Sequence, residues 1–496
     1  MKQKISKKTG AASLILFFAN VVFFLTIWLL SQYDSICFDQ FLYQIKSSAK
    51  GSDSILILSG FLYMGGFGGL LTAAEIFLFC LFSGKIPKFN LSGKFSKFLS
   101  KKALPLALVF LALAVVFFVD RINIISYAKT ATAKTQFFEE NYVNPAEVEL
   151  KFPEKKRNLI CIFAESTENS YASRSDGGQF KDNYIPELTD LAKQNINFSN
   201  TKGLGGALSY DGTTWTAAGL ISATSGVTVK IPVMTGAYDR IGGYMNGVYT
   251  LGDILNKNGY NQEIIMGSDS GFANRDLYFK QHGNYEILDL NEIKKQGRLP
   301  KNYNEWWGFE DLKLFQYAKE ECIRLSKEDK PFNLTLLTAD THFPNGYVCP
   351  KCKDEFDNRY SNVLRCSSSQ ISEFVEWVKT QHFYQNTTIV ILGDHLTMDP
   401  KFMKNVDKDY KRTVYNCIIN SAVEPINEKE RSFGSFDLYP TTLAALSVEI
   451  EGDRLGLGTN LFSNEQTLTE KYGFQKANKL IAGKSDYYNK EILDMK

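Results

Sequence analysis

The chain has 496 residues, a formal net charge of +2 and a hydrophobic fraction of 44%. Charge this close to balance excludes the broad electrostatic attraction to nucleic acid that a strongly basic chain would have, so no nucleic-acid partner is expected. At about 100–200 residues per domain, the length predicts two or three units. The first 120 residues are apolar and contain few acids, whereas the remainder has the composition of a water-soluble domain.

Three apolar segments, residues 11–31, 55–82 and 103–119, are long enough to cross a membrane as helices. Lysines precede the first segment and fill the loop between the second and third, and such clusters stay in the cytoplasm. Three spans would then place everything after residue 120 outside the cell. If residues 55–82 instead formed a two-span hairpin, the lysine-rich loop would be outside. Glu75 within this segment is either a functional acid or, as we favour, an acid held against a neighbouring helix.

The eight cysteines fall into different settings. Cys161 and Cys417 lie in apolar, strand-like runs that predict buried thiols. Four others lie in more polar surroundings, and in an extracellular domain they would form two disulfides in one of three pairings. These four are Cys322, Cys349, Cys352 and Cys366. The C-P-K-C sequence at 349–352 could instead begin a zinc knuckle, although a second C-x-x-C is missing.

The soluble part divides into a connector at 121–157, a domain at 158–466 and a polar tail at 467–496, which we expect to be peripheral. Within the domain, short apolar runs alternate with helical patterns. The runs are residues 159–164, 262–267, 333–338 and 387–393. Continuous apolar runs are typical of parallel strands buried on both faces. The pattern therefore predicts an α/β domain with a central, mostly parallel sheet covered by helices.

Ligands of such sheets gather at the carboxyl ends of the strands. Glu165 follows the first apolar run, and Asp394 and His395 follow the last. A carboxylate beside an imidazole suits a borderline divalent metal such as manganese or zinc. Each residue alone has an ordinary interpretation, as a helix-terminal acid or a turn. Their coincidence at one sheet edge favours a metal site.

Three further residues could act on a phosphate. The segment 209–226 (SYDGTTWTAAGLISATSG) indicates a turn followed by a helix from Thr213, whose hydroxyl would lie at the positive helix end. There it could serve as a metal-bound nucleophile, although a simple N-cap is favoured on spacing alone. His342 could contact a phosphate oxygen or protonate a leaving group, with a structural role equally open. Arg275 could clamp a phosphate, although a solvated arginine is commoner.

Six stretches in this order resemble the alkaline phosphatase/sulfatase superfamily: NLICIFAESTENSY, DGTTWTAAG, GFANRD, TADTHFPNGY, ILGDHLTM and FDLYPTTLAAL. Within it, the chain looks like the phosphoglycerol transferases, which include lipoteichoic acid synthases and enzymes that add phosphoglycerol to glucans. The resemblance covers residues 158–463 and implies a sulfatase-like α/β fold. The absence of the C/S-x-P-x-R context, replaced by Thr-Thr-Trp-Thr-Ala, speaks against sulfatase activity.

The resemblance also implies that a divalent metal would be bound by Glu165, Thr213, Asp394 and His395. The metal that it favours is Mn²⁺, with Mg²⁺ or Zn²⁺ as alternatives. Thr213 would be the nucleophile, with Thr214 as the neighbouring alternative. His342 and Arg275 would contact the phosphoglycerol group. Lipoteichoic acid synthases carry a Trp two residues before this arginine, where this chain has Ala273. That departure favours the glucan-modifying branch.

The implied activity is transfer of glycerol phosphate from phosphatidylglycerol to an extracellular glycan or glycolipid through a phospho-threonine intermediate. The implied location is a bacterial cell membrane, with several spans and the catalytic domain outside. A phosphoethanolamine transferase and a membrane-anchored phosphodiesterase are alternatives with the same site chemistry. A non-catalytic receptor on a decayed enzyme fold is a third, which failure to bind a metal would favour.

Overall fold

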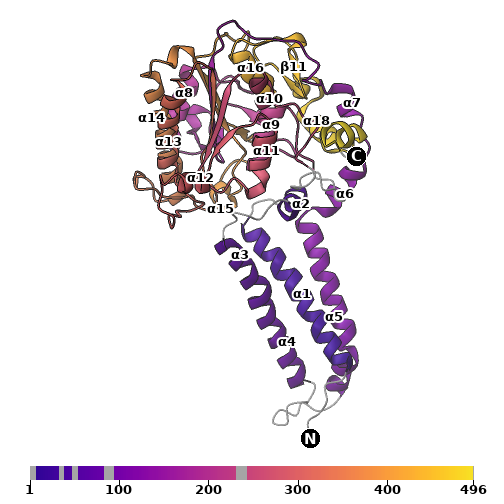
Figure 1. Cartoon of the computed structure of the whole chain (residues 1–496). Helices are drawn as coiled ribbons and strands as arrows, with labels where there is room; N and C mark the ends of the chain where they lie inside the picture. The colour runs from indigo at the N-terminus through magenta and orange to yellow at the C-terminus, as the bar shows by residue number, and fades with distance from the viewer. Residues whose placement is uncertain (1–6, 33–37, 47–53, 83–93, 231–242, 495–496) are drawn as a thin grey trace. The chain divides into compact units, whose positions relative to one another are not determined.

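The computed structural model describes residues 7–32, 38–46, 54–82, 94–230 and 243–494 (Figure 1). The chain separates into two compact units. The first comprises residues 1–38 and 52–129, and the second comprises residues 39–51 and 130–496. Residues 39–46, which lie between the first two apolar stretches, therefore belong to the second unit.

The first unit is helical. Its helices are α1 (Lys7–Gln32), α3 (Ser54–Phe61), η1 (Leu62–Phe67), α4 (Gly68–Phe82) and α5 (Lys94–Arg121), followed by α6 (Ile124–Thr132) at the boundary. Three stretches, Gly10–Gln32, Ile57–Leu81 and Lys101–Arg121, are long and apolar enough to cross a membrane. Residues 55–82 thus form one helical run rather than a hairpin. Asn20 Nδ2 donates to Glu75 Oε2 at 2.8 Å, so this acid is held by a neighbouring helix, as favoured from the sequence.

The second unit is built on a six-stranded sheet in the order β5-β4-β6-β2-β7-β9. The strands are β2 (Asn158–Ala164), β4 (Asn261–Met266), β5 (Glu286–Leu288), β6 (Phe332–Leu337), β7 (Thr387–Gly393) and β9 (Asn416–Ile419). All neighbours are parallel except β7 and β9. This confirms the predicted mostly parallel sheet. Ala164 pairs with Gly393, so β2 and β7 end side by side.

Helices cover both faces of this sheet (Figure 1). Because side chains alternate along a strand, Ile160 and Ile162 pack into one core while Leu159 and Phe163 pack into the other. The first core includes α8 (Pro186–Gln194), α13 (Asp311–Leu325) and α14 (Arg359–Lys379). The second includes α9 (Thr216–Ser225), α10 (Leu251–Lys257), α11 (Arg275–Gln281) and α16 (Leu438–Ala445). The sheet is therefore buried on both faces, which explains its continuous apolar runs.

Short elements complete the second unit. They are α2 (Phe38–Lys46), α7 (Phe137–Asn141), α12 (Leu290–Lys295), α15 (Pro400–Met403), and the strand pairs β1 (Leu150–Lys151) with β10 (Glu449–Ile450), β3 (Ala207–Leu208) with β8 (Thr413–Val414), and β11 (Arg454–Leu455) with β12 (Gly458–Thr459). The segment 467–496 forms α17 (Leu468–Tyr472), α18 (Phe474–Ala482) and η8 (Tyr488–Ile492). It buries Leu468, Ile481 and Tyr488 in the second core, and Tyr488 Oη donates to Thr228 O at 2.8 Å. These C-terminal residues thus contribute to the packing of the domain.

Candidate metal and phosphate site

Three predicted ligands meet at the carboxyl edge of the sheet. Glu165 follows β2 directly, and Asp394 and His395 follow β7. His395 Nε2 lies 3.3 Å from Glu165 Oε1 and 3.6 Å from Asp394 Oδ2. One ligand atom from each residue lies within 4.8 Å of the others, and all three residues are buried. The sequence rule that strand ends converge therefore brings these three residues together.

The ligand orientations are fixed by neighbouring groups. Ser166 Oγ donates to Glu165 Oε1 at 2.7 Å, and the amides of Ser166 and His395 both donate to Asp394 Oδ1 at 2.7 Å. His395 Nδ1 lies 2.8 Å from Leu396 O, an arrangement that directs Nε2 toward the carboxylates. Among the described residues, Asp394 Oδ2 is buried and has no hydrogen-bond partner. The cluster is thus held rigidly around an unsatisfied oxygen.

These distances fit a shared divalent cation. Oxygen and nitrogen ligands that bind a metal tetrahedrally at about 2.0–2.2 Å lie about 3.4 Å from one another. The observed separations between cluster atoms, 3.3 and 3.6 Å, agree with that value. The donor set of two carboxylates and an imidazole suits Mn²⁺ or Zn²⁺. The residues present therefore fit a divalent metal without deciding which one.

The electrostatics of the cluster also call for positive charge. Burial raises the pKa of Asp394 well above its usual range, and the charge of Glu165 raises it further. Burial also opposes ionisation of Glu165, but His395 outweighs it and holds the Glu165 pKa below its usual range. Burial lowers the pKa of His395, yet the two carboxylates outweigh it and raise that pKa to about 10. Two buried carboxylates need positive charge beside them, which the protonated His395 ring supplies here and a bound divalent cation would supply in its place.

The threonine that reaches this cluster is Thr216, three residues after the predicted one. Its Oγ1 donates to Glu165 Oε2 at 3.2 Å and lies 3.4 Å from His395 Nε2. Thr213 instead donates to Tyr210 O at 2.9 Å and accepts from Tyr210 N at 3.0 Å. The hydroxyl of Thr213 is therefore committed to the backbone of a turn. The expectation that Thr213 starts the helix is therefore wrong, and Thr216 occupies the position beside the cluster at which Thr213 was expected.

The error has a local physical cause. The Asp-Gly signal at 211–212 forms a turn in which Gly212 has φ +78°, so it does not open the helix. Trp215 then adopts an extended conformation, with φ −143° and ψ 159°, and α9 begins only at Thr216. The Ala-Ala-Gly run that follows Thr216 was the sequence signal for the true start. The Asp-Gly pair at 211–212 therefore forms a turn and does not cap a helix.

The start of α9 also offers backbone donors. No side chain of the described residues caps this ten-residue helix, so the amides of its first turn remain available to an anion. Gly219 allows the helix to approach the cluster closely, since a Cβ at this position would come 2.0 Å from Asp394 O. The glycine therefore sets how near Thr216 can come to the cluster.

Arg275 and His342 lie close enough for the charge of Glu165 to act on both. Arg275 is buried at the start of α11 and donates to Ser268 Oγ and Asp269 O, both at 2.9 Å. His342 is half-buried, and its Nδ1 lies 2.6 Å from Phe343 O. Burial lowers the pKa of both side chains, and Glu165 opposes that change. Both predicted substrate-contacting residues therefore belong to the electrostatic surroundings of the cluster.

Two aromatic residues at this site had no sequence signal. The Trp307 ring lies 4.9 Å from the His342 ring and 5.9 Å from the Phe272 ring. Tyr43, from α2, is fully buried; its Oη lies 2.5 Å from Tyr244 Oη and donates to Ala273 O at 2.8 Å. Its ring also packs 5.3 Å from that of Trp215, the residue before Thr216. A segment distant in sequence thus supports both Thr216 and the loop that carries Arg275.

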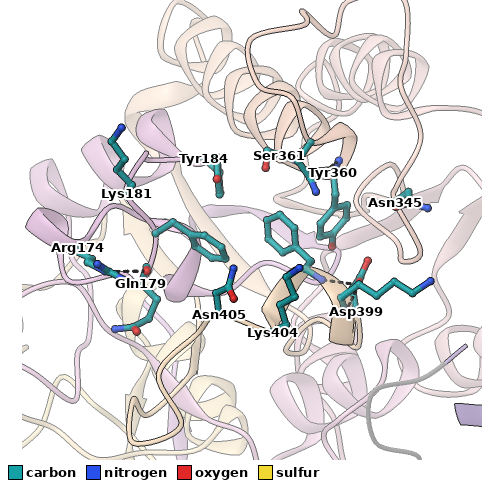
Figure 2. A pocket seen from close by; sticks show the side chains of 14 residues that line it. Arg174, Gln179, Lys181, Tyr184, Asn345, Tyr360, Ser361, Asp399, Lys404 and Asn405 are labelled. Carbon is teal, nitrogen blue, oxygen red and sulfur yellow. Dashed lines mark hydrogen bonds between the residues drawn. The ribbon is translucent and has the colours of Figure 1, made fainter. Parts of the chain in front are cut away.

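A separate hollow of about 520 Å³ is lined by residues of the segment 174–184 and by residues at the starts of α14 and α15 (Figure 2). Figure 2 shows basic side chains, including Lys181 and Lys404, around aromatic rings. None of the cluster residues lines it. Tyr360, which lines the hollow, connects it to the cluster through hydrogen bonds. Its Oη donates to Thr341 O at 2.7 Å, and Thr341 Oγ1 donates to Glu165 O at 2.5 Å. The hollow therefore touches the support of the cluster rather than the cluster itself.

Comparisons with known proteins agree with this geometry. Residues 157–448 match the family model named Sulfatase. Phosphoglycerol transferase I of Salmonella choleraesuis (strain SC-B67) is 30% identical over 369 residues, which cover 72% of this chain and 46% of that protein. The Escherichia coli (strain SMS-3-5) protein of the same name is 30% identical over 287 residues, covering 57% and 36%. The chain thus spans less than half the length of these curated relatives.

Solved structures give a more distant likeness. The lipoteichoic acid synthase LtaP from Listeria monocytogenes is 17% identical with a TM-score of 0.49, covering 64% of this chain and 79% of that one. The lipooligosaccharide phosphoethanolamine transferase EptA from Neisseria meningitidis is 12% identical with a TM-score of 0.49, covering 96% and 87%.

Proposed function

This chain belongs to the sulfatase family, and from that premise we propose that it is a metal-dependent phosphoglycerol transferase. It would move glycerol phosphate from phosphatidylglycerol to an extracellular glycan or glycolipid acceptor. The observation that carries the proposal is the hydroxyl of Thr216, placed at the start of α9 and 3.2 Å from Glu165 Oε2. The name phosphoglycerol transferase I, borne by relatives 30% identical to this chain, supports the choice of donor.

Thr216 is the proposed nucleophile. Its hydroxyl would attack the phosphorus of the lipid head group, with its proton directed toward Glu165 Oε2, and a bond from threonine to phosphorus would form as diacylglycerol leaves. A divalent cation held by Glu165, Asp394, His395 and Thr216 would lower the pKa of that hydroxyl and offset the charge of the phosphate. A hydroxyl of the acceptor would then attack the same phosphorus, the bond between Thr216 Oγ1 and phosphorus would break, and the proton first passed to Glu165 would return to Thr216 as the acceptor hydroxyl gives up its own.

Other residues would bind and orient the phosphate. The amides of the first turn of α9, which no side chain caps, would donate to a phosphate beside Thr216. Arg275 would add positive charge, and its guanidinium is already oriented by Ser268 and Asp269. In its protonated form, His342 would direct Nδ1–H at Phe343 O and could donate its second proton from Nε2 to the departing oxygen, and the charge of Glu165 favours that form. Trp307 and Phe272 would form an apolar wall beside His342.

The helical unit gives the proposed location. Three helices could cross a membrane, and the lysines that flank them favour an extracellular catalytic domain on a multi-pass bacterial protein. Anchoring would keep the site among lipid donors and raise their effective concentration.

The test uses the full chain in detergent with phosphatidylglycerol labelled in its head group and Mn²⁺, quenched with acid before acceptor is added. Mass spectrometry should find a glycerophosphate adduct on the peptide that contains Thr216. A phosphoethanolamine adduct, formed only from phosphatidylethanolamine, would replace the proposed donor. Free glycerol phosphate released without any acceptor would indicate a phosphodiesterase. The proposal would be overturned if neither an adduct nor turnover were detected with any divalent metal.

A further inference from the structure

Three of the cysteines converge on the loop that follows β6. Cys349 and Cys352 lie in this loop, and Cys366 lies on α14. Cys349 Sγ is 3.7 Å from Cys366 Sγ and 3.6 Å from Cys352 Sγ, and all three sulfur atoms lie within 4.8 Å of one another. Cys322 is not in this group; it lies on α13 and is buried in the first core. The expected arrangement of two disulfides among four cysteines is therefore not what the described residues show.

The separations match thiolates that share a metal. Thiolates bound tetrahedrally to zinc at about 2.3 Å lie about 3.8 Å from one another, so three of them form one face of a tetrahedron. The observed 3.6 and 3.7 Å agree with that face. A disulfide, with sulfur atoms about 2.05 Å apart, would join only two of the three and leave the third unused.

A second observation points to a ligand among these sulfurs. Gln370, one helical turn after Cys366, is only 3% exposed. Its Nε2 donates to Cys366 Sγ at 3.4 Å and to Cys349 Sγ at 3.7 Å, while its Oε1 is buried without a hydrogen-bond partner in the part of the chain described. Amide donors to sulfur are the usual outer contacts of metal-bound thiolates. The exposed side chain of Lys353 would offset part of the negative charge that three thiolates bring, whereas Lys351 is paired with Glu373.

We propose that Cys349, Cys352 and Cys366 bind one zinc ion. Soft thiolates select zinc over Mn²⁺ or Mg²⁺, so this ion would differ in exchange behaviour from one held by Glu165, Asp394 and His395. Cys352 is only half-buried, which leaves the fourth ligand position to water. Because His342 lies in the same loop as Cys349 and Cys352, the zinc fastens the loop that carries His342 to α14. Its role is structural, and the proposal does not depend on the proposed transfer reaction.

The experiment measures zinc by mass spectrometry in the full chain, purified in detergent after growth with added zinc. Four forms are compared: wild type, Cys352→Ser, Cys322→Ala as a buried-thiol control, and Asp394→Asn, which disables the other centre. Zinc should persist in Cys322→Ala and in Asp394→Asn, and Cys352→Ser should lose about one zinc ion per chain relative to wild type. Since Asp394→Asn should abolish transfer and keep this zinc, failure of the transferase proposal and failure of the zinc proposal are separable.

A second measurement does not depend on any variant folding. Wild-type chain loaded with Co²⁺ should show the charge-transfer absorption of thiolate bound to cobalt, and a mercurial reagent should remove both the band and the zinc. Alkylation without reduction, followed by peptide mapping, should find all three cysteines unpaired after zinc removal. A disulfide between any two of them in zinc-free protein as purified, or zinc content that Cys352→Ser leaves unchanged, would overturn the proposal.

Discussion

Replacing Thr216 by alanine isolates the chemical role of one hydroxyl. The change removes the contacts of 3.2 Å to Glu165 Oε2 and 3.4 Å to His395 Nε2. It should leave the helix intact, because Trp215 is the N-cap and alanine is the best helix former. If Thr216 forms the covalent intermediate, turnover should fall by at least ~10³-fold, or ~4 kcal/mol of transition-state stabilisation. Thr216→Ser keeps a hydroxyl and should retain part of the activity.

The assay is release of diacylglycerol from phosphatidylglycerol, with the acid-quenched adduct as a second readout. Thr213→Ala is the matched control, since it removes a neighbouring hydroxyl of the same kind. Thr213 makes two buried hydrogen bonds with Tyr210, so its loss should cost ~1–3 kcal/mol of stability and lower the melting temperature. Turnover per folded molecule should change only a few-fold. The reverse pattern, with Thr216→Ala active and Thr213→Ala inactive but folded, would refute the assignment.

Three further changes test the surroundings of the site. Gly219→Ala should weaken Mn²⁺ binding by at least ~10-fold, because the added Cβ would lie 2.0 Å from Asp394 O. Calorimetric titration measures the Mn²⁺ affinity, and an unchanged affinity would contradict the close approach of α9 to Asp394. Tyr43→Phe removes the hydroxyl that donates to Ala273 O, and it should lower kcat several-fold while the Mn²⁺ affinity stays unchanged. A variant that loses thermal stability but keeps its kcat would show that Tyr43 contributes only to packing. Burial raises the pKa of Glu263 from 4.5 to about 8, so the folded state holds this proton more tightly and stability falls as pH rises across that interval. Glu263→Gln should flatten the decline in melting temperature between pH 4.5 and about 8, and an identical slope would exclude Glu263 as its source.

The sequence predicted those parts of the site that depend on strand ends. Glu165, Asp394 and His395 each follow a continuous apolar run, and parallel strands present such residues at one edge. The register of β2 and β7 confirms this, since Ala164 and Gly393 are paired. This inference needed no knowledge of side-chain packing.

The same reasoning failed at the threonine because two local signals compete there. Asp-Gly marks both helix starts and turns, and the choice depends on the φ angle of Gly212. Helix propensity alone did not resolve a difference of three residues, which corresponds to about 4.5 Å along a helix axis and decides whether a hydroxyl reaches the cluster. Correct placement of Thr216 required the contact between Gly219 and Asp394 O, which is tertiary.

Tyr43 shows a different limit of sequence reasoning. Hydropathy separates an apolar N-terminal part from a polar domain, and it assigns residues 39–51 to the former because they lie between apolar segments. Contacts place them in the second unit, where Tyr43 packs on Trp215 and binds Ala273 O. Thr216 and Arg275, on different elements, are thereby supported by one side chain from the connection between the first two candidate spans. A fragment that began at residue 121 would lack the Tyr43 side chain. The support of Thr216 and Arg275 therefore depends on a segment that hydropathy alone assigns to the membrane anchor.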